Sequence, residues 1–187
     1  MSADTPVEDA CDGFSVGCMD LTVRPGPDGI WLLAFDGHET RCAIGRSGIS
    51  AAKREGDGAS PAGTYALREG FFRPDRVTPP ATALKLTPLS KDDGWCDAPD
   101  DPSYNRPVKL PYAASHEKMW REDGLYDVVV VIGYNDDPVV AGKGSAIFMH
   151  ICREDYGPTA GCVAVPMGEM LTLLPRLSAA TRITFTG

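Results

Sequence analysis

Short apolar runs separated by polar turns dominate the chain from Met19 onward. The segments MDLTVR, IWLLAF and HETRCAIG occupy residues 19–24, 30–35 and 38–45. Their apolar positions follow the two-residue period of a strand. Asp36-Gly37, a dipeptide typical of a tight hairpin turn, separates the last two segments. We therefore expect a strand followed by a β-hairpin in this part of the chain.

The same pattern predicts further strands along the chain, at residues 64–70, 81–89, 125–133, 145–151, 163–166 and 182–187. The segment LYDVVVVIG at 125–133 has β-branched residues on both faces, which is typical of a central strand. Residues 167–180 have the helical spacing of Met170, Leu173, Leu174 and Leu177, and Pro175 is expected to kink or restart that helix.

The middle of the chain is less regular. Residues 91–111 are rich in Asp, Pro and aromatic side chains, so we expect a long irregular excursion, functional or at the surface. Residues 114–123, ASHEKMWRED, are expected to form one or two helical turns. Strands outnumber helices, and the predicted fold is mostly β: a sandwich or barrel with one helix after Cys162.

Composition limits the protein class. The 187 residues fit one domain with a sizeable core, and 43% apolar content is that of an ordinary globular protein. The net charge of −8 argues against a partner of nucleic acid or anionic membrane. No apolar run approaches the roughly 20 residues of a membrane span. Residues 1–18 are acidic and lack the pattern of a secretory signal. We expect them to form a flexible leader before a domain at residues 19–187.

Six cysteines are dispersed along the chain without the paired spacing of a structural zinc site. Cys11 and Cys18 would be the local disulfide pair in an oxidising compartment. Cys42 and Cys152 are expected to be free and buried.

Candidate chemistry centres on the segment 145–165, SAIFMHICREDYGPTAGCVAV. His150 ends one expected strand and Cys162 begins the next, and a thiol beside an imidazole is sufficient for nucleophilic acyl transfer. Gly161 permits backbone N–H groups, its own and that of Cys162, to converge as an oxyanion hole. A core role for either residue is the alternative, as is a metal site of His150, Cys152 and Cys162, which lacks a fourth ligand at a familiar spacing. A backbone carbonyl is the expected partner that orients His150.

Chain order separates classes of cysteine enzymes. Papain-like and NlpC/P60-like enzymes place Cys before His, whereas here His150 precedes Cys162. Sortases share the order His then Cys, and His116 lies upstream as well. However, the nearest downstream arginine is Arg176 in the expected helix, and no TLxTC motif is present.

Two motifs in order resemble the YkuD L,D-transpeptidase family. His150 followed by Thr159-Ala160-Gly161-Cys162 is similar to the family's His–loop–Gly–Cys signature. Residues 60–65, SPAGTY, are similar to its [ST]-P-x-G-x-[FY] segment. Ala160 and Ala164 depart from the family pattern, in which many members have His and then Asn or Arg. The resemblance runs from about residue 21 to the C-terminus, and no LysM or other wall-binding module accompanies it.

The resemblance implies a mixed-sheet sandwich or barrel of the L,D-transpeptidase catalytic type with one or two short helices. It also implies a peptidoglycan cross-linking enzyme in which Cys162 attacks the carbonyl at the L-centre of meso-diaminopimelate and forms a thioester. The link formed, 3→3 or 1→3, stays open, and a hydrolase or a non-catalytic wall-binding domain on the same scaffold are the alternatives. Expected partners are stem peptides and carbapenem-type β-lactams. We expect no metal or other cofactor, a monomer, and a periplasmic location.

Substrate contacts are expected from charged and aromatic residues near the motifs, because stem peptides carry carboxylates. Residues 91–123 are a candidate lid or insertion. The candidate substrate-binding residues are Lys53, Arg54, Trp95, Tyr104, Arg153, Tyr156 and Thr159.

Overall fold

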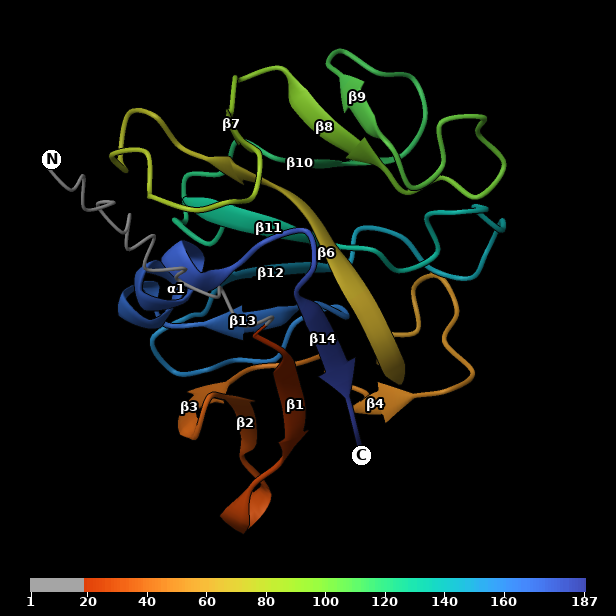
Figure 1. The fold of residues 1–187 in the computed structure, drawn as a ribbon. Coiled ribbons are helices and arrows are strands. Elements are labelled where there is room, and N and C mark those ends of the chain that lie inside the picture. Colours follow the sequence, from red (N-terminus) through yellow and green to blue (C-terminus); the bar gives the residue numbers. More distant parts are fainter. Residues whose placement is uncertain (1–18) are drawn as a thin grey trace, which may run out of the picture.

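A nine-stranded mixed sheet organises the computed structural model, which describes residues 19–187 (Figure 1). The predicted leader and the Cys11–Cys18 pair lie outside the described residues. In spatial order, the sheet's strands are β13 (Val163–Val165), β12 (Phe148–Ile151), β11 (Val128–Ile132), β6 (Gly63–Phe72), β14 (Arg182–Phe185), β1 (Leu21–Pro25), β2 (Trp31–Phe35) and β3 (His38–Cys42), with β7 (Leu86–Pro88) beside β6.

The two ends of this sheet meet. Ala43, just after β3, exchanges two backbone hydrogen bonds of 2.8 Å with Ala164 of β13. The sheet is therefore nearly closed into a barrel, which leaves few unpaired backbone groups along its edges. The strands of the barrel lie where the apolar pattern predicted them, and the mostly β class is confirmed.

Local sequence explains several of these elements. Asp36 and Gly37, between β2 and β3, have φ angles of 44° and 76°, and a two-residue hairpin turn with positive φ at both positions favours glycine. All five residues of β11 are buried, as its β-branched sequence predicted for a central strand. The predicted helix is α1 (Met167–Leu173), and the 3₁₀ turn η2 (Leu174–Arg176) follows at Pro175.

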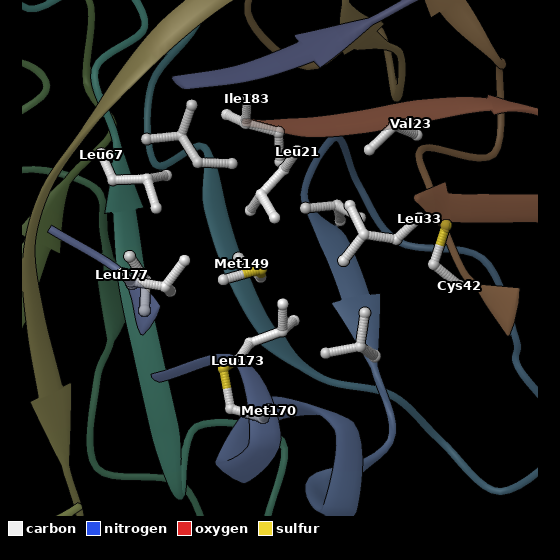
Figure 2. Packing of buried hydrophobic residues seen from close by; sticks show 14 of the residues in the cluster. Leu21, Val23, Leu33, Cys42, Leu67, Met149, Met170, Leu173, Leu177 and Ile183 are labelled. Carbon is white, nitrogen blue, oxygen red and sulfur yellow. The ribbon is translucent and has the colours of Figure 1, made fainter. Parts of the chain in front are cut away.

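The barrel interior holds a large apolar cluster (Figure 2). Leu21, Leu33, Met149 and Ile183 reach it from the sheet, and Leu173 reaches it from α1. The 3₁₀ turn η1 (Pro27–Gly29) lies outside this cluster, between β1 and β2.

The middle of the chain differs from expectation. Residues predicted as an irregular excursion contain β8 (Asp93–Cys96) and β9 (Pro107–Lys109). Residues predicted as helical contain β10 (His116–Lys118), and the three strands form a separate sheet in the order β10-β8-β9. The helical prediction was wrong because β10 pairs with β8, a tertiary contact that overrides a weak local preference.

This three-stranded sheet lies over the barrel near β11 (Figure 1). A smaller apolar cluster fills the space between them and contains Trp95, Met119, Tyr126, Phe148 and Cys162. A short parallel pair, β4 (Ile49–Ser50) and β5 (Ser60–Pro61), lies before β6. No helix in residues 19–187 combines the length and the apolar character that a membrane span requires.

Candidate active site

A cavity of about 530 Å³ lies where β12 and β13 meet the three-stranded sheet, and both His150 and Cys162 line it. Its wall comes from five separate parts of the chain: residues 46–58 on either side of β4, the three-stranded sheet with the residues that follow its strands, the residues before β12, β12 itself, and the segment 152–164 that leads into β13. The cavity therefore brings together the His–loop–Gly–Cys motif, the residues just before the Ser-Pro-x-Gly motif and the middle insertion.

Cys162 ends the loop before β13 and is 7% exposed. Its Sγ donates to the carbonyl oxygen of Ala146 at 3.2 Å and accepts from the backbone N–H of Phe148 at 3.4 Å. Burial raises the pKa of the Cys162 thiol to about 12, and the carboxylate of Glu117 acts in the same direction. The resting group is therefore a neutral thiol whose sulfur is held between two backbone groups.

His150 lies on β12 and is 6% exposed. Its Nδ1 hydrogen-bonds the carbonyl oxygen of Ile151 at 2.9 Å. Because a carbonyl only accepts, Nδ1 carries the proton and Nε2 of the neutral ring carries the lone pair. The backbone carbonyl that the sequence predicted as the partner of His150 is that of Ile151. Burial lowers the pKa of His150 to about 4.

The register of β12 and β13 relates these two side chains. The strands are parallel, and Met149 pairs with Val163 and His150 with Ala164. Continuing this register puts Cys162 beside Phe148, so Cys162 and His150 emerge on the same face, two residues apart along the strand direction. Strands about 4.8 Å apart with a rise of about 3.3 Å per residue then separate their Cα atoms by about 8 Å. Within residues 19–187, no hydrogen bond joins the two side chains.

The turn before Cys162 requires glycine. Gly161 has a φ of 151°, and a Cβ there would lie 2.9 Å from the carbonyl oxygen of Ala59. The Gly161 N–H donates to Thr159 Oγ1 at 3.1 Å, and the Thr159 hydroxyl donates to the carbonyl of Cys162 at 2.7 Å. Of the two predicted oxyanion donors, Gly161 thus already has a partner.

An aromatic and charged cluster faces His150. The Tyr126 ring meets the His150 ring edge to face, with centroids 5.1 Å apart, and its hydroxyl donates to Glu117 Oε1 at 2.6 Å. The Arg121 guanidinium lies 3.7 Å from the same carboxylate oxygen and 5.0 Å from the Tyr126 ring centroid. Burial raises the pKa values of Glu117 and Tyr126. Glu117, Arg121 and Tyr126 line the cavity, and Glu117 lies on β10, within the residues that were interpreted as helical.

Charges of both signs line the cavity. Lys53 is a buried cation whose Nζ bonds Asp57 at 2.8 Å. Asp97 also lines the cavity, and its Oδ1 is buried without a hydrogen-bond partner within residues 19–187. No three His, Cys, Asp or Glu side chains of these residues are grouped to hold a metal ion.

The predicted substrate contacts separate into two groups. Lys53, Arg153 and Thr159 line the cavity. Tyr156 does not, and the Arg41 guanidinium lies 4.2 Å from its ring centroid. Arg54 is exposed and also does not line the cavity.

Trp95 and Tyr104 are candidate substrate-binding residues by sequence, and the structure places both away from the cavity wall. Trp95 Nε1 donates to Asn105 at 3.0 Å, and the Tyr104 hydroxyl donates to Glu55 at 2.5 Å. Both residues are buried and neither lines the cavity. Among the other cysteines, Cys42 is free and buried as predicted, and Cys152 is free but only half-buried.

Among protein families, the model of the YkuD family, described as an L,D-transpeptidase catalytic domain, matches residues 31–184. The match includes Ser60 and the segment from His150 to Cys162. Neither the curated proteins nor the solved structures that were compared give a match.

Proposed function

The chain belongs to the YkuD family of L,D-transpeptidase catalytic domains, and from that premise we propose that it cross-links peptidoglycan stem peptides through a thioester on Cys162. One observation carries the proposal: Cys162 and His150 emerge on the same face of two paired strands and line the same cavity. The acyl donor is the carbonyl at the L-centre of meso-diaminopimelate, and the product is a 3→3 or 1→3 link.

The first half-reaction begins from a neutral pair, because burial disfavours both the thiolate and the imidazolium. Proton transfer from Cys162 to Nε2 of His150 therefore accompanies attack of the sulfur on the donor carbonyl. For this transfer the thiol turns away from the carbonyl of Ala146. The tetrahedral oxyanion is stabilised by backbone N–H, and the leaving amine takes the proton from His150 as the C–N bond breaks.

The second half-reaction consumes the thioester. The amine of an acceptor stem attacks the thioester carbonyl, His150 accepts the proton that the amine loses, and Cys162 leaves and recovers a proton. General acid–base catalysis of this kind contributes about 10²–10⁴-fold to the rate. Asp97 and Glu117 give one part of the cavity wall a negative character that suits an acceptor ammonium, and Arg121 and Arg153 supply cations for stem carboxylates.

Peptidoglycan as substrate implies that the protein works in the periplasm, and this location is part of the proposal. The chemistry also implies that carbapenem-type β-lactams acylate Cys162, because ring opening uses the same attack on a carbonyl.

The test is incubation of the protein with purified disaccharide-tetrapeptide muropeptides together with free tetrapeptide, whose L-Ala amine is available for a 1→3 link, and products are identified by mass. We expect cross-linked dimers from the wild type and from Cys42→Ala, which removes a buried thiol outside the cavity, and none from Cys162→Ala. The position of the new bond in the dimers separates the 3→3 from the 1→3 link.

Cleaved monomers without dimers would support a hydrolase instead. Unchanged muropeptides with folded wild type would overturn both enzymatic functions and leave the wall-binding domain.

A further inference from the structure

The two motifs of the sequence meet through one buried hydroxyl. Ser60, from the Ser-Pro-x-Gly segment, has no solvent-exposed surface, and its Oγ donates to the carbonyl oxygen of Gly161 at 2.7 Å. The same Oγ accepts the backbone N–H of Gly45 at 3.0 Å. This contact spans 101 positions of the chain and ends at the residue before the nucleophile.

Ser60 is itself held in place by backbone contacts. It lies on β5, whose Ser60 pairs in register with Ile49 of β4. The Ser60 N–H donates to the carbonyl oxygen of Gly48 at 2.9 Å. With its backbone fixed and its hydroxyl bonded on both sides, the Ser60 Oγ is a rigid donor to Gly161.

The peptide group whose carbonyl accepts the Ser60 hydrogen bond also contains the N–H of Cys162. In a planar trans peptide, the carbonyl and the N–H point in opposite directions, so fixing the Gly161 carbonyl toward Ser60 aims the Cys162 N–H away from it. Within residues 19–187, the Cys162 N–H donates to no acceptor. In contrast, the Gly161 N–H donates to Thr159 Oγ1. Of the two predicted oxyanion donors, Cys162 is therefore the one whose N–H is available.

From this geometry we infer that Ser60 is a positioning residue for the oxyanion hole: its hydroxyl holds the Gly161–Cys162 peptide so that the Cys162 N–H receives the oxyanion, and the Gly161 N–H does not. The inference rests on the proposed acyl transfer at Cys162. It assigns a physical task to the Ser-Pro-x-Gly motif, which does not line the cavity at Ser60 and contacts no reacting atom.

The test compares two reactions of the same thiol. Acylation by a carbapenem passes through an oxyanion, whereas alkylation by iodoacetamide is a displacement that forms none. Both rates are followed by mass spectrometry of the peptide that contains Cys162. For Ser60→Ala, we expect acylation to fall by about 10²-fold, the cost of misplacing a catalytic group by about 1 Å, with alkylation within about threefold of wild type.

Ser60→Thr keeps the hydroxyl and is expected to restore acylation. Thr181→Val is the matched control: it also removes a fully buried hydroxyl, one that accepts the Ser178 N–H, but it lies outside the cavity wall. It should leave both rates unchanged. Acylation of Ser60→Ala at the wild-type rate, or an equal fall in both reactions, would overturn the inference.

A second measurement uses the wild-type protein and does not depend on the folding of a variant. A peptide aldehyde adds to the Cys162 thiol as a hemithioacetal, with the sulfur bonded to the carbonyl carbon and the thiol proton on its oxygen. In amide NMR spectra, hydrogen bonding to that oxygen should shift the Cys162 N–H downfield and leave the Gly161 N–H in place. A downfield shift of Gly161 alone would overturn the assignment.

Failure of the proposed function looks different. In that case, the wild-type protein would be alkylated at Cys162 but would not be acylated, whatever residue occupies position 60, and both the function and the inference would fall together.

Discussion

The large and the small apolar clusters each bury a free thiol, and the two thiols differ in almost everything except acidity. Cys42 lies in the large cluster inside the barrel, and Cys162 lies in the small cluster under the three-stranded sheet. Burial raises the pKa of each to about 12. Only Cys162 lines the cavity, beside His150. A thiol's pKa therefore does not distinguish the proposed nucleophile from Cys42, and the neighbours of the thiol do.

The clusters also differ in the polar groups that their buried aromatic members carry. Leu33, Met149 and Leu173, in the large cluster, present only apolar atoms from their side chains. The small cluster contains Trp95 and Tyr126, whose polar atoms bond Asn105 and Glu117. The barrel interior thus contributes mainly burial of apolar area, and the small cluster combines burial with the polar groups that surround Cys162.

Replacement of His150 by Asn should show the largest effect. It removes the base beside Cys162 and leaves Cys42 untouched, so acylation of Cys162 by a carbapenem should fall by about 10²–10⁴-fold. Stopped-flow measurement of the acylation rate checks this. His38→Asn, on a ring whose side chain is 51% exposed, is the control and should acylate normally. If Cys162 of His150→Asn were acylated at the wild-type rate, the neighbouring histidine would not be what distinguishes Cys162 from Cys42.

A matched pair of truncations separates the clusters themselves. Leu173→Ala in the large cluster and Met119→Ala in the small cluster each remove a buried side chain, and each should lower the free energy of unfolding by about 2–5 kcal/mol. Only Met119→Ala should admit water near Cys162 and lower its thiol pKa, and alkylation should then rise about tenfold for each unit lost.

Urea denaturation measures the stability of this pair, and peptide mapping after iodoacetamide treatment measures the reactivity. An equal rise in Cys162 alkylation for Leu173→Ala would show that packing in the large cluster controls the reactivity of Cys162 as much as packing in the small cluster does.

The free energy of unfolding should also depend on pH, by about 3 kcal/mol, because His150 is buried beside Cys162. The pKa of His150 is about 4 in the folded protein and 6.5 in its ordinary state, so the unfolded chain binds more protons between these values. The free energy of unfolding should therefore be highest above about pH 6.5 and fall by about 3 kcal/mol as the pH drops to about 4.

Denaturation series at several pH values in this window check the slope. His150→Asn should flatten it, and His38→Asn should not. An unchanged slope in His150→Asn would mean that His150 is not buried in its neutral form.

The barrel could be predicted from the sequence because its strands carry their signal locally. Five consecutive β-branched residues in β11 and the Asp36-Gly37 turn are readable without any partner. The strands β8 and β10 could not be found in this way. They are short, and each is stabilised by pairing with the other rather than by its own pattern.

The candidate site shows the same division. Cys162 and His150 could be proposed as a pair from their residue types and their places on two successive predicted strands. Their proximity was decided by the fold, because the end of one strand lies near the start of the other in the parallel pair of β12 and β13 only when both strands are short. Trp95 and Tyr104 could not be placed, since an aromatic residue in an irregular sequence carries no sign of which way it points. Glu117 and Tyr126 were missed because their hydrogen bond joins two segments that only the fold brings together.

The sequence by itself determined the mostly β class, the order of the barrel strands along the chain, and the two motifs that resemble the family, and it nominated His150 and Cys162 as the candidate pair. These follow from local periodicity and from residue types, which can be recognised without knowing which other segments a stretch contacts. Only the tertiary structure decided that the Ser60 hydroxyl donates to the Gly161 carbonyl and that the Gly161 N–H donates to Thr159. It also decided that burial raises the pKa of both Cys42 and Cys162 to about 12. Hydrogen-bond direction and desolvation depend on which distant segments pack together, and that is settled by the closed barrel and the sheet above it.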